Sequence, residues 1–162
     1  MTSDSRRSHP ESAPRCLTHP FLGRISVRKE QIITFTPGLQ GLGRFHRYVL
    51  IERPQEAPFL WLLSVAKPDL ALAVMEPARL VADYQVQVSD ALLKDLAART
   101  PADLKVLVIL TIPAGRPQEA TANLLAPLLI NLAAGRGKQV VLESQAYSQA
   151  HPLFPRLAGK EG

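Results

Sequence analysis

The longest apolar run of the chain, residues 121–142, constrains the fold more than any other segment. Helical spacing is one interpretation, since leucines recur at Leu124, Leu125, Leu128, Leu129 and Leu132. However, Pro127 lies inside the run, and a proline in a helix interior costs about 3 kcal/mol. The glycines around Arg136, followed by Val140 and Val141, favour a hairpin of two strands. We therefore prefer the hairpin, with Pro127 at a bulge or an edge, because proline cannot donate a ladder hydrogen bond.

The rest of the chain consists of short apolar runs separated by prolines, of which there are 14 in 162 residues. This pattern is typical of turn-rich β structure. We expect two strands within residues 21–35, and further strands at 44–52, 59–65, 71–75, 86–88 and 104–112. Residues 89–100 predict one helix, with Ser89 as its N-cap and Pro101 at its end. The predicted fold is mainly β: a small antiparallel barrel or roll of about eight short strands with one short helix.

The chain length predicts one domain between two tails. Residues 1–20 are rich in Ser, Pro, Arg and His, which predicts a disordered basic tail, and residues 154–162 are expected to be a flexible C-terminal tail. A single cysteine, Cys16, cannot form a disulfide framework within one chain. No apolar stretch reaches 18 residues, and no signal-peptide core is found at the start. We expect a cytoplasmic protein without a membrane segment.

No residue pattern predicts catalysis. The sequence contains no GxSxG, HExxH or CxxC motif, and its four histidines lack the spacing of metal ligands. The glycines of residues 38–43 lack the Lys-Ser/Thr pair of a phosphate-binding loop. We therefore expect no catalytic residue, no metal and no cofactor. An enzyme whose site assembles from residues distant in sequence stays open as an alternative.

The net charge is +5, and the isoelectric point near 9.7 permits contact with nucleic acid. However, lysines and arginines form no run, aromatic residues make up 6% of the chain, and the aromatic pattern of RNA-binding modules is absent. We favour a scattered basic surface. A small basic β domain that binds RNA remains the alternative.

Several short runs follow one another in a fixed order along the chain. They are Ile33-Thr34-Phe35, Gly38-Leu39-x-Gly41, Arg47-Tyr48-Val49-Leu50, Pro58-Phe59-Leu60-Trp61-Leu62, Ser64-Val65, Pro68-Asp69-Leu70-Ala71, Thr121-Ala122-Asn123-Leu124-Leu125-Ala126-Pro127, Ile130-Asn131, Gly137-Lys138-Gln139-Val140-Val141 and Tyr147. In this order they resemble the bacterial flagellar assembly factor FliW family. The resemblance covers residues 22–153, so residues 21–153 are expected to form a single FliW-like β domain.

The resemblance implies a protein without enzymatic activity that binds two protein partners. One is flagellin, and the other is CsrA, an RNA-binding translational repressor. It implies no cofactor, no membrane and no direct contact with nucleic acid. A flagellin-binding, chaperone-like factor without control of CsrA is the alternative. Members of the family are acidic overall, whereas this chain is basic.

Polar positions of the matched hairpin are the candidate partner-binding residues: Asn123, Asn131, Lys138 and Gln139. The competing interpretation is that these side chains support turns and ladders within the chain.

Overall fold

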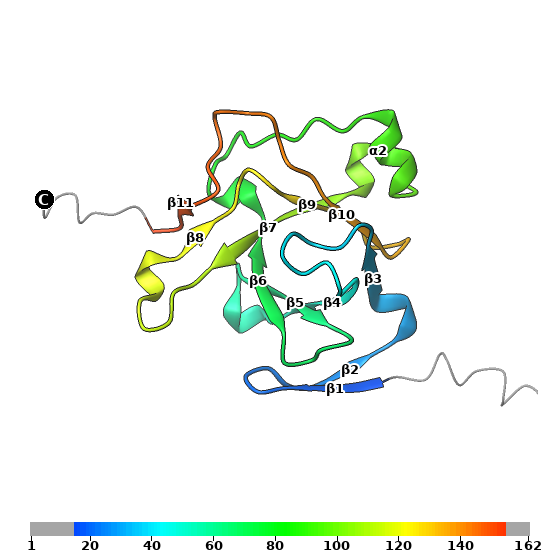
Figure 1. Ribbon diagram of the computed structural model, residues 1–162, viewed down its shortest axis with the longest axis vertical. Coiled ribbons are helices and arrows are strands. Elements are labelled where there is room, and N and C mark those ends of the chain that lie inside the picture. The colour runs from blue at the N-terminus through cyan, green and yellow to red at the C-terminus, as the bar shows by residue number, and fades with distance from the viewer. Residues whose placement is uncertain (1–14, 155–162) are drawn as a thin grey trace, which may run out of the picture.

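Seven strands close into a β-barrel in the computed structural model, which describes residues 15–154 (Figure 1). Around the ring they are β3 (Ile32–Phe35), β4 (Arg47–Glu52), β5 (Leu60–Ser64), β6 (Ala71–Met75), β7 (Lys105–Thr111), β9 (Leu128–Asn131) and β10 (Arg136–Gln139). This confirms the predicted mainly β barrel. Of the seven pairings in the ring, six are antiparallel, and β10 closes the ring by pairing with β3 in parallel. The sequence did not predict this parallel pair. It follows from the strand number, because alternating directions cannot close an odd ring.

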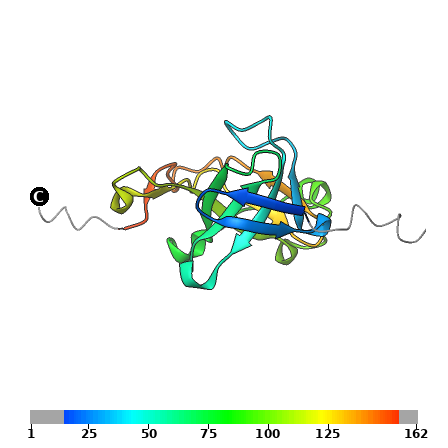
Figure 2. The same ribbon diagram turned by 90° about the horizontal axis from the view of Figure 1, so that it is seen from below.

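Four further strands lie outside the ring. They are β1 (Arg15–His19), β2 (Gly23–Val27), β8 (Thr121–Ala122) and β11 (His151–Pro152). Strands β8 and β11 extend the sheet beyond β7, whereas β1 and β2 form a separate two-stranded ribbon that lies across one side of the barrel (Figure 2). The predicted tail of residues 1–20 is therefore wrong for residues 15–19. Leu17 pairs with Ile25 in this ribbon, a partner that the polar composition of the tail did not reveal. Residues 1–14 and 155–162 lie outside the described residues.

Apolar side chains from the ring strands, together with Leu39 from the segment between β3 and β4, fill the barrel. The fully buried members of this core are Ile33, Phe35, Leu39, Tyr48, Leu62, Val74, Leu107, Leu128 and Ile130. A second cluster lies where β7, β8 and β11 extend the sheet, and it includes Val108, Leu110, Ala122 and Leu153. These buried side chains give the barrel a closed apolar interior.

The predicted hairpin is confirmed for β9 and β10, which pair in antiparallel register. Its turn includes Gly135, whose φ of +67° is a conformation that glycine adopts without strain. The first strand is shorter than predicted, because residues 123–127 separate β8 from β9. Pro127 lies in this irregular segment, where its carbonyl oxygen accepts a hydrogen bond from the Val140 amide (3.0 Å).

One α-helix, α2 (Asp90–Asp95), occurs within residues 15–154, and it is shorter than the predicted 89–100. The Ser89 hydroxyl accepts the Leu92 amide at 3.1 Å, so the predicted N-cap is confirmed. The helix ends early because Ala97 adopts a left-handed φ of 55°. The expected strand at 86–88 is not formed. Short 3-10 helices occupy Lys29–Gln31, Pro54–Glu56, Pro77–Arg79, Pro101–Asp103 and Pro117–Glu119.

Candidate functional site

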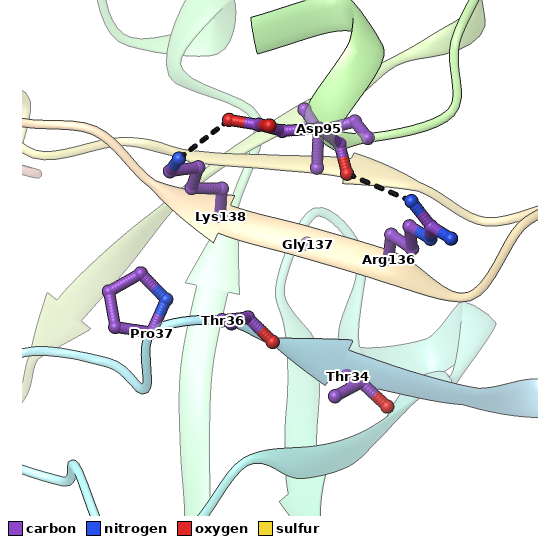
Figure 3. Close-up of a pocket in the computed structure, with 8 residues that line it drawn as sticks. Thr34, Thr36, Pro37, Asp95, Arg136, Gly137 and Lys138 are labelled. Carbon is purple, nitrogen blue, oxygen red and sulfur yellow. Dashed lines mark hydrogen bonds and ion pairs between the residues drawn. The ribbon is translucent and has the colours of Figure 1, made fainter.

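A pocket of about 550 Å³ opens at the seam where β10 closes the barrel against β3 (Figure 3). We call it the seam pocket. The C-terminal end of α2 forms its third wall. Its lining residues are Thr34, Thr36, Pro37, Asp95, Leu96, Arg136, Gly137 and Lys138.

The register of the seam decides which side chains reach the pocket. Arg136 lies opposite Thr34, and Gly137 lies opposite Phe35. Successive strand residues point to opposite faces, and Phe35 fills the barrel core. Arg136 and Lys138 therefore share the outer face with Thr34, and all three line the pocket.

The backbone of β10 lies very close to the core at Gly137. A Cβ atom at this position would come within 2.5 Å of the Phe35 ring, which is itself fully buried. A side chain larger than hydrogen would have to displace that ring. The floor of the seam pocket is therefore fixed by close packing.

Two cations and one carboxylate meet in the pocket. The Lys138 ammonium lies 3.0 Å from the Asp95 carboxylate, and Arg136 Nη1 donates to the Asp95 main-chain oxygen at 3.2 Å (Figure 3). Both groups of the ion pair are partly accessible, with 30% of the Lys138 side chain and 55% of the Asp95 side chain exposed. The pocket therefore carries one formal positive charge in excess.

Asn131, a predicted partner-binding residue, is buried at the end of β9. Its amide nitrogen donates to the carbonyl oxygens of Leu96 (2.9 Å) and Ala97 (3.1 Å), and its oxygen accepts the Ala134 amide (3.3 Å). These bonds satisfy carbonyl groups at the C-terminal end of α2, which have no partner within the helix. Asn131 thus holds one wall of the seam pocket in place.

The other three predicted residues differ in position. Lys138 lines the pocket. The next residue, Gln139, accepts the Gln40 amide (2.8 Å) and donates to the Ala126 carbonyl (3.2 Å), which joins the glycine-rich loop to the hairpin. The Asn123 oxygen accepts the amides of Leu125 and Ala126, both at 3.1 Å, and is not among the pocket residues. It shapes the turn between β8 and β9.

Four polar pocket residues were not predicted: Thr34, Thr36, Asp95 and Arg136. Two of them lie on β3 or directly after it, one lies on α2 and one on β10, so they meet only when the ring closes. The Gly-Arg-Gly sequence around Arg136 was the sole local signal.

A second pocket, of about 590 Å³, contains two titratable groups with shifted pKa values, Tyr84 and Asp103. Burial, together with the neighbouring Tyr147, raises the pKa of Tyr84 to about 12, and its hydroxyl donates to the Leu124 carbonyl (2.6 Å). Backbone amides of Arg99 and Thr100 lower the pKa of Asp103. Both shifts accompany contacts that support the backbone. No cluster of three metal-ligating side chains occurs within residues 15–154.

Comparison with known proteins identifies the family. A sequence model described as FliW protein matches residues 17–153. The chain belongs to the FliW family. The match begins within β1, so most of the β1–β2 ribbon is included in the matched region together with the barrel. FliW is a family of flagellar assembly factors without enzymatic activity, and this chain is a flagellar assembly factor of that kind.

Alignments to individual FliW proteins cover most of the chain. The flagellar assembly factor FliW of Thermosipho africanus is 34% identical over 132 residues, which are 82% of this chain and 91% of that protein. The FliW of Pseudothermotoga lettingae is 38% identical over 130 residues, which are 80% and 83% of the two chains. A crystal structure of the flagellar assembly factor FliW superposes with a TM-score of 0.78 at 31% identity and covers 88% of this chain and 99% of that one. No helix in the described part of the chain has the length and apolar character needed to cross a membrane.

Proposed function

We propose that this protein binds flagellin and the translational regulator CsrA in the bacterial cytoplasm, and so couples flagellin synthesis to flagellar assembly. Membership of the FliW family, over residues 17–153, is the observation that carries the proposal. When flagellin is scarce, the protein binds CsrA and relieves the repression of flagellin mRNA. When unsecreted flagellin accumulates, it occupies the protein, and CsrA represses again.

The exchange of partners follows from linkage between two binding equilibria. If flagellin and CsrA cannot bind together, each lowers the apparent affinity of the other by the same factor. No chemical step is needed, which agrees with a family of assembly factors. The two partners need only overlap on the surface, or favour different arrangements of it.

The predicted hairpin residues belong to the proposed partner surface in two ways. Lys138 lies on β10 in the seam pocket and is proposed to contact a partner directly. Asn131, Asn123 and Gln139 are proposed to act by fixing the backbone near this surface, because their amides bond to main-chain groups. Substituting Lys138 should therefore weaken partner binding without lowering stability.

The charge of the chain bears on how it would antagonise CsrA. An acidic protein bound to CsrA would disfavour RNA electrostatically, but this chain has a net charge of +5. We therefore expect steric or conformational antagonism. Salt screens interactions between exposed charges, so it would weaken an electrostatic mechanism but not a steric or conformational one. Raising the salt concentration should therefore leave the inhibition of CsrA largely unchanged. A clear loss of inhibition at high salt would contradict this mechanism.

The proposal is tested by measuring the affinity of the full chain for flagellin and for CsrA from its own host, each alone, by isothermal titration calorimetry. Binding to both supports the proposal. Binding to flagellin alone would identify an assembly chaperone without translational control. If neither protein binds and an RNA does, with strong salt dependence, the proposal is wrong and the basic domain binds nucleic acid instead.

A further inference from the structure

We infer that residues 85–88 are an open strand edge, with which an extended, basic segment of a protein partner pairs as a β-strand. This inference rests on the proposed function, because the segment belongs to one of the two proposed partners. It adds a place on the surface, a mode of binding and a chemical character for the bound segment.

Residues 85–88 have the pattern of a strand but no strand partner. Their sequence, Gln-Val-Gln-Val, is the one for which a strand was predicted, and exposed and half-buried positions alternate along it. Within the described residues, however, no strand pairs with this segment, and in Figure 1 it leads into α2 as a green loop. A strand-like segment without a neighbour presents unpaired backbone groups to another chain.

The backbone of the segment has one occupied edge and one open edge. The Gln85 amide donates to the Tyr147 hydroxyl at 3.2 Å, so the first edge faces Tyr147. In an extended chain the N–H and C=O groups of successive residues point to opposite edges, so those of Val86 and Val88 point to the second edge. Within residues 15–154 these four groups have no hydrogen-bond partner. An incoming strand would therefore bond to Val86 and Val88.

Contacts fix both ends of the segment in the free protein. Before it, Tyr84 donates its hydroxyl to the Leu124 carbonyl at 2.6 Å, and its ring centroid lies 4.5 Å from that of Tyr147. After it, Ser89 caps α2 by accepting the Leu92 amide at 3.1 Å. A segment that is held between two anchors loses less conformational freedom when a partner pairs with it. The open edge is therefore prepared for binding.

A hollow beside the segment offers space for a side chain of the partner. Val86 lines the second pocket, of about 590 Å³, together with Tyr84, Val106 and Leu132. Leu132 is a large apolar residue that is 46% exposed, and a partner side chain in the pocket would cover it. Strand addition combines main-chain hydrogen bonds with pockets that accept alternate side chains. We therefore expect the bound segment to carry an apolar residue that enters this pocket.

The surroundings of the segment are acidic, in contrast to the chain as a whole. The second pocket is lined by two carboxylates, Glu76 and Asp103, and by one cation, Lys105. Residues 80–93 contain two acids and no lysine or arginine. One of these acids, Asp83, is exposed, and no cation of the described residues lies within ion-pair distance of it. Charge complementarity therefore favours a partner segment that carries lysine or arginine beside its apolar residue.

Hydrogen exchange followed by mass spectrometry tests the strand addition on the full chain, alone and with flagellin or CsrA from its own host. We expect the amides of residues 85–88 to exchange about tenfold more slowly in one of the two complexes, because strand pairing protects them from water. Equal exchange in the free chain and in every complex that forms would overturn the inference and leave the proposed function intact. If the wild type binds neither protein, the proposed function fails, and the inference fails with it.

Two variants of Val88 separate the backbone edge from the side chain. Val88→Pro removes an amide that has no partner within residues 15–154, so the fold should be kept while the affinity for the protected partner falls about tenfold. Val88→Ala is the matched control, since it keeps the amide, and its affinity should fall less than about twofold. Calorimetric titration measures both affinities, and circular dichroism checks that both variants are folded. Equal affinities of the two folded variants would contradict pairing at this edge.

The acidic surroundings are tested by Asp83→Asn. We expect this variant to bind the same partner about threefold more weakly at low salt and equally well at high salt, since salt screens exposed charges. Asp69→Asn is the matched control, because Asp69 is an exposed acid paired with Lys67 (2.9 Å) in the turn between β5 and β6. Unchanged affinity of Asp83→Asn at low salt would show that the bound segment is not basic, against the inference.

Discussion

Two tyrosines of this protein carry the same hydroxyl group in different surroundings. Tyr48 is fully buried in the barrel, its ring is 5.7 Å from that of Phe35, and its hydroxyl has no hydrogen-bond partner among the described residues. Tyr84 lies near Tyr147 and donates its hydroxyl to the Leu124 carbonyl at 2.6 Å. A buried polar group without a partner costs free energy, whereas a bonded one contributes to stability.

Removing the two hydroxyl groups should therefore have opposite effects. We expect Tyr48→Phe to raise the free energy of unfolding by about 1 kcal/mol, and Tyr84→Phe to lower it by about 1 kcal/mol. Urea unfolding followed by fluorescence measures both. A loss of stability in Tyr48→Phe as large as that in Tyr84→Phe would show that the Tyr48 hydroxyl has a partner in solution.

The contact between Gly137 and Phe35 gives a second prediction at this scale. Gly137→Ala should lower the free energy of unfolding by about 1–3 kcal/mol, because the new methyl group would overlap the fully buried Phe35 ring and force it to shift. Gly43→Ala is the control, since a Cβ there meets nothing within 4 Å. Equal stability of the two variants in thermal unfolding would contradict a tightly packed seam.

At the scale of elements, the attachment of α2 to the barrel depends on one side chain. A six-residue helix has little stability of its own, so packing and capping contacts must hold it. Ser89 caps its N-terminus, and Asn131 bonds to the carbonyl groups of Leu96 and Ala97 at the other end. The helix wall of the seam pocket is therefore tied to β9.

Substitution of Asn131 tests this attachment. Asn131→Ala should lower the free energy of unfolding by about 1–3 kcal/mol, because it leaves buried backbone groups without partners. Relative to the wild type, hydrogen exchange should also accelerate more at the amides of α2 than at those of β5. If the amides of α2 keep their protection in this variant, other contacts hold the helix, and Asn131 is not its anchor.

Local sequence patterns predicted the elements whose conformation depends on residues close together in the chain. The apolar runs that form β4 to β7, the Ser89 cap and the glycine turn before β10 could all be predicted from the sequence. The break at residues 123–127 could not, because it depends on the Asn123 side chain, whose oxygen accepts the amides of Leu125 and Ala126. The β1 strand was missed because the polar composition of residues 1–20 does not indicate a strand. Its order depends on pairing with β2.

The candidate site could be predicted only in part, because most of its residues are distant from one another in sequence. Lys138 was identified from the hairpin, but Thr34 and Asp95 come from a strand and a helix far from it in sequence. Their convergence depends on the parallel pairing of β3 with β10, and this pairing follows from the closure of seven strands rather than from any local pattern. Pairings between segments distant in sequence leave no periodic signal.

At the scale of the whole molecule, the positive charge is unevenly distributed. Within residues 15–47 there are six lysines and arginines and one acid, Glu30, whereas residues 48–154 hold nine basic and ten acidic residues. The charge surplus therefore belongs to the β1–β2 ribbon and to the segment leading into β4. The barrel strands that follow are close to neutral, and the excess charge of the seam pocket is a local feature.

The most direct test of the proposed function is competition between the two partners. A complex of this protein with fluorescently labelled CsrA is titrated with unlabelled flagellin, and the anisotropy of the label is followed. We predict that anisotropy falls to the value of free CsrA, and that the flagellin concentration at the midpoint rises with the concentration of the protein. An anisotropy that stays constant or increases while flagellin binds would show that both partners are held at once, and would contradict the partner exchange.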